Sequence, residues 1–239
     1  MRKKAMIFIL EGPSDDTSLT GSLKYIFASS RIEPLIMHGD ITSDRNVTNR
    51  NIIKKLHEEI KAFCNKNFLT KGNILRIVHI IVHIIDTDGA FIPDELIQED
   101  TDCRQIVYSE NSIRCISKKN LIRRNHIKQQ NLQKLLDTHN IGGLSYSVYY
   151  MSSNLEHVLH NRINLTDEEK EELSYEFAEI CAEKPEYFIQ LMTSQTVFID
   201  GSYRESWDFI KSGKHSLERH SNLALCFYGS FGYESINDH

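Results

Sequence analysis

The segment ILRIVHIIVHIIDTDG, residues 74–89, decides the fold class of this chain. Its apolar part is rich in β-branched residues and lacks polar alternation, which predicts a central parallel strand covered on both faces. Arg76, His79 and His83 interrupt the run, and it is far shorter than the roughly 20 residues that span a bilayer. We expect the two histidines to be packed in the core and the strand to end at Asp86.

The sequence on both sides of this strand continues an α/β pattern. Short apolar runs predict strands, and apolar residues at helical spacing predict helices. Before the central strand the order is strand, helix, strand, helix, which favours a parallel sheet. The other predicted strands are residues 5–10, 33–37 and 144–151. One predicted helix begins after Asp15, and two others cover residues 52–63 and 117–138.

The last third of the chain is predicted to be helical. It opens with a capping box, in which Thr166 caps the helix and Glu169 reaches back to the cap. We therefore expect an α/β domain at residues 1–160, with a basic helical insertion at about 111–138. Residues 161–239 are expected to form an α-helical appendage packed on that domain.

Composition limits the classes of partner. The chain has 239 residues and a formal net charge of −5, so a surface that binds nucleic acid has to be local. The five cysteines show no CxxC pairing, which is typical of reduced thiols in the cytoplasm. The first apolar stretch is interrupted at Glu11, too early for a signal peptide. The expectation is a soluble, cytoplasmic protein without a membrane partner.

Acidic residues follow two of the predicted strands. Glu11 and Asp15 follow the first strand, and Asp86 and Asp88 follow the central one. Because ligands of an open parallel sheet lie outside the carboxyl ends of the strands, we expect these carboxylates at one edge. Four carboxylates repel one another unless a cation joins them, and Mg²⁺ prefers oxygen ligands that it shares with substrate phosphates. The sequence therefore predicts a Mg²⁺ site for phosphate chemistry.

These two motifs resemble those of Toprim domains. FILEGPSDDTSL, residues 8–19, is similar to the Toprim glutamate motif, and HIIDTDGAF, residues 83–91, is similar to the DxD motif. The resemblance covers roughly residues 5–160 and implies a Toprim-like parallel sheet flanked by helices.

The resemblance also implies roles for single residues. Glu11 is expected to be a general acid/base or a metal ligand, and Asp86 and Asp88 to be catalytic Mg²⁺ ligands with Asp15 beside them. A second ion needs a further acid. Glu156 is the best candidate, although a solvated glutamate in the first turn of a helix is an equal alternative. Mn²⁺ is expected to substitute for Mg²⁺.

Basic residues suggest where a nucleic acid binds. Residues 111–136 hold seven Lys or Arg and no Asp or Glu, so a helix there offers a cationic face or, alternatively, an ordinary solvated face. OLD-family (overcoming lysogenization defect) Toprim nucleases are similar in using a lysine late in the chain, here Lys211 or Lys214, of which Lys214 is the catalytic candidate. The expected nucleic-acid contacts are Lys118, Lys119, Arg123, Arg124 and Lys128.

The resemblance implies a small endonuclease that cuts RNA, such as tRNA, or DNA. The Toprim effectors of bacterial anti-phage systems are the most similar group, and such toxic effectors often work with a separate ATPase, so an ATPase partner is expected. A homo-oligomer stays open. Two alternatives remain: a haloacid-dehalogenase-like phosphatase that uses Asp86 and Asp88, and a catalytically silent Toprim-like binding module. An Asx turn at Asp86–Asp88 without chemistry is the plainest interpretation.

Overall fold

The computed structural model describes residues 4–28, 30, 32–39, 41–42, 44, 46–67 and 71–230. The chain folds into two compact units. The first unit comprises Met1–Ile85 and Ile127–Val148, and the second comprises Asp86–His126 and Tyr149–His239. Each unit takes two separate segments of the chain. The expected division into domains at residue 160 stays a prediction.

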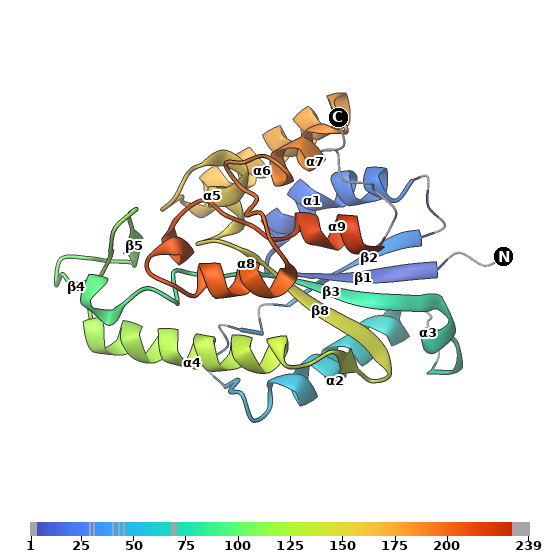
Figure 1. The fold of residues 1–239 in the computed structure, drawn as a ribbon, viewed down its shortest axis with the longest axis horizontal. Coiled ribbons are helices and arrows are strands. Elements are labelled where there is room, and N and C mark those ends of the chain that lie inside the picture. Colours follow the sequence, from blue (N-terminus) through green and yellow to red (C-terminus); the bar gives the residue numbers. More distant parts are fainter. Residues whose placement is uncertain are drawn as a thin grey trace. The chain divides into compact units, whose positions relative to one another are not determined.

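A five-stranded sheet confirms the α/β class (Figure 1). Strand β1 pairs in parallel with β2 on one side and with β3 on the other, and β7 pairs with β8 in antiparallel orientation. The sheet is therefore mixed but mostly parallel. Its order is β2 (Ile32–His38), β1 (Lys4–Leu10), β3 (Val78–Asp86), β8 (Leu144–Met151) and β7 (Asn140–Ile141).

The core of the first unit forms around β1. Residues 5–10 are at most 4% exposed, which is the burial expected of a parallel strand covered on both faces. Helices α1 (Pro13–Ile26) and α2 (Ile52–Lys66) lie on opposite faces of the sheet (Figure 1). Right-handed crossovers require this, since the chain moves outward from β1 to β2 and then back to β3.

The central apolar run differs from its prediction at its beginning. Lys71–Ile77 form helix α3, and the strand starts only at Val78. Leu75 and Arg76 are good helix formers, and the pairing of β3 with β1 begins at Val78.

One of the two histidines in that strand is not in the core. His83 is fully buried as expected, but His79 is exposed. The cause is a β-bulge, because Ala5 pairs with Val78 while Met6 already pairs with Ile80. The extra residue breaks the alternation that would have placed both histidines on one face.

The second unit contains a small sheet that the sequence did not predict. It has the order β4 (Ile97–Glu99), β6 (Ile113–Cys115) and β5 (Val107–Tyr108), and 3₁₀-helix η1 (Asp94–Leu96) precedes it. Leu121 and Leu217 pack with Ile92, Ile97 and Ile113 in its core, so the late part of the chain belongs to this unit.

Helices make up the rest of the second unit. Thr166 and Glu169 form the expected capping box at the start of α6. Helix α4 (Lys118–Leu136) confirms the predicted basic helix and passes from the second unit into the first. The helices of the last third are α5 (Leu155–His160), α6 (Asp167–Glu183), α7 (Tyr187–Met192), α8 (Tyr203–Ile210), η2 (His215–Leu217) and α9 (Ala224–Ser230).

Membrane-spanning helices and disulfide bonds are both absent from the described residues. Over these residues, no helix is both long and apolar enough to cross a membrane. All five cysteines lie at described positions and are free thiols. Burial raises the pKa of Cys226 to about 12, so this thiol stays protonated at neutral pH.

Candidate functional site

The end of β1 places two acids of the first unit at the start of a helix. Glu11 follows the last residue of β1, and Gly12 is the N-cap of α1. The backbone N–H of Gly12 donates to Oδ2 of Asp15 at 3.0 Å, and Asp15 is only 9% exposed. A carboxylate in the first helical turn is favoured because the N-terminal N–H groups carry partial positive charge. Asp15 therefore holds the turn that directs the chain away from Glu11.

Glu11 itself lies between a hydroxyl group and a buried cation. The hydroxyl of Thr42 donates to Oε1 of Glu11 at 3.0 Å, and Nζ of Lys128 lies 4.0 Å from the same oxygen. The side chains of Lys128 and Glu11 are 2% and 11% exposed. A buried charge has to be compensated, and both contacts favour the ionised form of the carboxylate.

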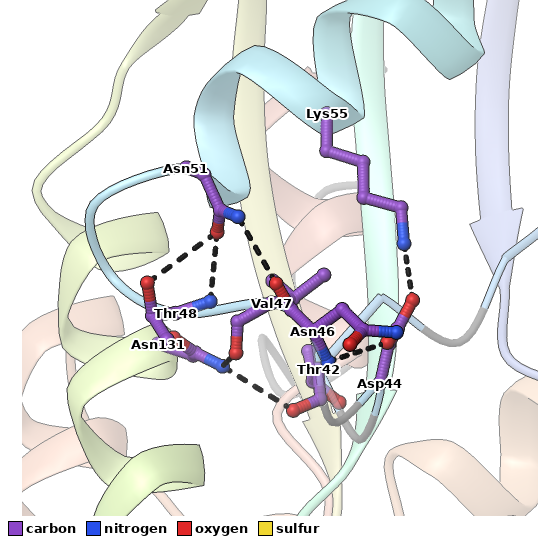
Figure 2. Close-up of polar contacts among 8 residues, drawn as sticks. All are labelled: Thr42, Asp44, Asn46, Val47, Thr48, Asn51, Lys55 and Asn131. Carbon is purple, nitrogen blue, oxygen red and sulfur yellow. Dashed lines mark hydrogen bonds and ion pairs between the residues drawn. The ribbon is translucent and has the colours of Figure 1, made fainter.

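Thr42 belongs to the loop between β2 and α2, and Figure 2 shows its polar neighbours in that loop and on α4. Asn131 of α4 donates through Nδ2 to the carbonyl oxygens of Thr42 and Val47, each at 3.4 Å. Farther along, Lys55 forms an ion pair with Asp44, and the hydrogen bond from Lys55 lowers the pKa of that carboxyl. Helices α2 and α4 thus fix the loop from both sides.

His83 is a neutral neighbour of this charged group. Its Nδ1 lies 2.8 Å from the hydroxyl of Tyr146, and its ring is fully buried. Burial, followed by the charge of Lys128, lowers the pKa of His83 to about 3. At neutral pH the imidazole is therefore uncharged and does not compete with Lys128 for the carboxylate.

In the second unit, two adjacent loops hold the DxD motif. Asp86 is the last residue of β3. The backbone N–H of Thr87 donates to the carbonyl of Met151 at 2.9 Å, and that of Asp88 donates to the carbonyl of Ser153 at 2.8 Å. The Thr87 hydroxyl accepts from the Ser153 N–H at 2.9 Å. These bonds join the loop that follows β3 to the loop that follows β8.

Gly89 allows the tight turn after the motif. Asp88 and Gly89 both have positive φ, 49° and 60°. A Cβ atom at Gly89 would lie 2.7 Å from the side chain of Leu217 and 2.8 Å from that of Ile113, so a larger residue is strained by its backbone and also requires these side chains to move. The turn is therefore specified by the motif sequence DTDG, and the interpretation of Asp86–Asp88 as an Asx turn without chemistry stays open.

Arg124 of α4 binds the same turn. Its Nη2 donates to the carbonyl oxygen of Asp88 at 2.9 Å and to Oδ1 of Asn125 at 2.8 Å. Burial opposes the charge of Arg124, but Tyr108 and the Asp88 carboxylate favour it, and the net pKa is raised. Arg124 is thus a fixed cation beside Asp88 and is turned away from bulk solvent.

Glu156 lies in the first turn of α5, as the sequence indicated, but it is not solvated. It is 5% exposed and forms an ion pair with Lys170 of α6 at 3.5 Å. Asn154 caps the helix by accepting from the N–H of His157 at 2.9 Å. The alternative of a solvated glutamate is therefore wrong, because α6 covers this position.

The predicted basic face divides into two groups. Lys119 and Arg123 are exposed and Lys118 is partly exposed, whereas Arg124 and Lys128 point to the acidic motifs of their respective units. The cause is the helical period, since positions 124 and 128 lie on the inner side of α4.

The late lysine lies on the surface of the second unit. Lys214 is exposed, and its Nζ donates to Oδ1 of Asn111. Its catalytic role stays a prediction.

The candidate acids therefore belong to both units. Glu11 and Asp15 lie in the first unit, and Asp86, Asp88 and Glu156 lie in the second. Sequence reasoning missed Thr42, whose loop position carries no motif. It also missed a cluster of His215, Glu218 and His220, although two histidines and a glutamate within six residues are visible in the sequence.

The fold and these motifs define an α/β chain with acidic strand ends. Comparison of the chain with protein-family models, with curated proteins and with solved structures found no match.

Proposed function

We propose that this chain hydrolyses phosphodiester bonds of nucleic acids with Mg²⁺, and that Glu11, Asp86 and Asp88 carry the reaction. The observation that supports this most is the strand order. β1 and β3 are parallel neighbours, and each ends in one of the two acidic motifs. The carboxyl ends of parallel strands are where open α/β sheets bind ligands.

The donor set fits the ion. Carboxylate oxygens without histidine or thiolate are the ligands that Mg²⁺ prefers. Asp86 and Asp88 are the proposed primary ligands, and Asp15 and Glu156 are the proposed further ligands of one ion or of a second. When bound, Mg²⁺ or Mn²⁺ supplies Lewis acidity to the phosphate and a more acidic water.

The residues around Glu11 suit a general acid/base. Thr42 donates to Oε1 at 3.0 Å, so the position of this oxygen is fixed. Lys128 lies 4.0 Å from it and is positioned to favour the carboxylate form that accepts a proton from water. Lys128 also offers positive charge beside the reacting phosphate.

The basic residues of α4 that do not contact the acidic motifs are suited to bind the nucleic-acid substrate. Lys118, Lys119 and Arg123 are the residues of α4 that remain accessible to a phosphate backbone. Lys214 is the proposed cation that stabilises the negative charge developing on the phosphate during cleavage.

We further propose that the chain is a Toprim-like effector of anti-phage defence, cutting RNA or DNA and restrained or triggered by a separate ATPase. The support is the resemblance of the two motifs to Toprim motifs, at the ends of β1 and β3 where that resemblance requires them.

The experiment is cleavage of labelled total RNA and plasmid DNA by the purified chain with Mg²⁺ and with EDTA. Glu11→Gln and Asp88→Asn are the test variants, and Glu58→Gln, at an exposed position of α2, is the matched control. We expect cleavage by the wild type and the control alone.

Phosphate release from p-nitrophenyl phosphate in the same samples tests the phosphatase alternative. Release that needs Asp88 but not Glu11, without nucleic-acid cleavage, would support the phosphatase instead. Cleavage that survives in both test variants would overturn the proposed site.

A further inference from the structure

Three side chains at η2 bring metal-binding atoms together within the second unit. Nδ1 of His215 lies 2.6 Å from Oε2 of Glu218, and Nε2 of His220 lies 3.3 Å from the same oxygen. One ligand atom from each residue lies within 4.8 Å of the others. We call these three residues the His-Glu-His cluster.

The two imidazoles are held in place by an aromatic ring. Phe209 of α8 stacks on His215 with ring centroids 3.8 Å apart and meets the edge of His220 at 5.2 Å. The three side chains are only partly exposed, at 32%, 34% and 17% for His215, Glu218 and His220. The cluster is therefore pre-organised on one side and open to solvent on the other.

The backbone of the cluster binds the loops around the DxD motif. The carbonyl oxygen of Ser216 accepts from the Thr87 hydroxyl at 3.2 Å and from the Ser153 N–H at 3.1 Å. The carbonyl oxygen of His220 accepts from the Ser152 N–H at 2.8 Å. Anything that fixes residues 215–220 therefore also fixes the segment between Asp86 and Asp88.

We propose that the His-Glu-His cluster binds a transition-metal ion, with Zn²⁺ as the best fit, and that this ion clamps the loop that carries Asp86 and Asp88. Two imidazoles and one carboxylate form a donor set for Zn²⁺, whereas Mg²⁺ prefers oxygen ligands alone. Three protein ligands leave a coordination position for water on the solvent side. This ion is chemically distinct from the Mg²⁺ of the proposed function.

The test is metal binding by the full-length chain without a histidine tag, after treatment with a chelator. Titration of Zn²⁺ against a chromophoric competitor is expected to show one site that His215→Gln and His220→Gln each weaken by at least roughly tenfold. His139→Gln, at an exposed histidine of the first unit, is the matched control and is expected to bind as the wild type does. Co²⁺ should give the visible absorption of an ion with nitrogen and oxygen ligands.

A second measurement tests the clamp and does not depend on cleavage activity. Zn²⁺ is expected to slow hydrogen exchange at the amides of Ser152 and Ser153 in the wild type, but not in His220→Gln. Absence of Zn²⁺ binding, or binding by both test variants as tight as that of the wild type, would overturn the site and leave a hydrogen-bonded cluster only. Binding without slower exchange at the two serines would overturn the clamp.

Discussion

Thr42 lies in the loop after β2 and contacts the proposed catalytic glutamate. It is 2% exposed and donates its hydroxyl to Oε1 of Glu11. In Thr42→Val the shape is retained but this hydrogen bond, which is worth about 1 kcal/mol, is lost. We expect Mg²⁺-dependent cleavage to fall roughly fivefold, since about 1.4 kcal/mol corresponds to a factor of ten.

Thr48→Val is the control for this prediction. Thr48 lies in the same loop, is exposed, and contacts Asn51 rather than Glu11. Equal rates for the two variants would contradict a role of the Thr42 hydroxyl in positioning Glu11.

His83 makes the stability of the fold depend on pH. Its pKa is about 3 in the folded chain and 6.5 for an unperturbed histidine, so between these values the unfolded chain binds the additional proton. Its contribution to stability is therefore complete above pH 6.5 and falls by up to about 1.4 kcal/mol per pH unit as the pH decreases towards 3. Urea unfolding of the wild type at pH 7 and pH 4.5 should show this loss.

His83→Gln retains a partner for Tyr146 but does not titrate. We expect this variant to lose about 2 kcal/mol less than the wild type between the two pH values. His139→Gln, at an exposed histidine, should lose as much as the wild type does. An unchanged pH dependence in His83→Gln would show that other groups cause the acid sensitivity.

Gly89, the glycine of the DxD turn, should tolerate substitution poorly. Gly89→Ala combines a positive φ with close approach to Leu217 and Ile113, and we expect it to destabilise the fold by about 1–3 kcal/mol. Gly21→Ala is the opposite case, because Gly21 lies in α1 with open space around it. That change should stabilise by about 0.5–1 kcal/mol. Thermal unfolding of both variants is the measurement, and destabilisation of equal size would contradict this interpretation.

At the scale of elements, α4 supplies two kinds of cation. Replacing Lys119 and Arg123 by Ala should weaken nucleic-acid binding at all sequences and reduce its salt dependence, because both side chains are exposed. Fluorescence anisotropy with a labelled oligonucleotide at several salt concentrations measures this. Lys61→Ala, on the exposed side of α2, is the control, and an unchanged salt slope in the double variant would assign the binding surface elsewhere.

The same element shows what the sequence was able to predict. The bounds of α4 followed from a long periodic run. The sequence did not predict which face of the helix turns inward, because Lys and Arg occur on both faces. Only packing turns Arg124 and Lys128 inward. The helix at Lys71–Ile77 and the bulge at His79 were missed for a related reason, since both depend on which β1 residue each position meets.

At the scale of the whole chain, the sheet class and both acidic motifs were predictable, but the compact units were not. Short strands such as β4 and β5 carry too few residues for a periodic signal. Leu217 joins their core from about 100 residues away, a contact that no local pattern encodes. The spacing of the His-Glu-His cluster follows no common zinc motif, so its three side chains are recognised as a group only in the folded chain.

A double-mutant cycle in Mg²⁺-dependent cleavage tests whether the two acidic motifs serve one reaction. Glu11→Gln and Asp86→Asn are each expected to reduce the cleavage rate at least roughly 100-fold. Because residues that act together are not additive, the double variant should be no slower than the slower single variant. Losses that multiply in the double variant, or wild-type cleavage by either single variant, would contradict one shared catalytic site.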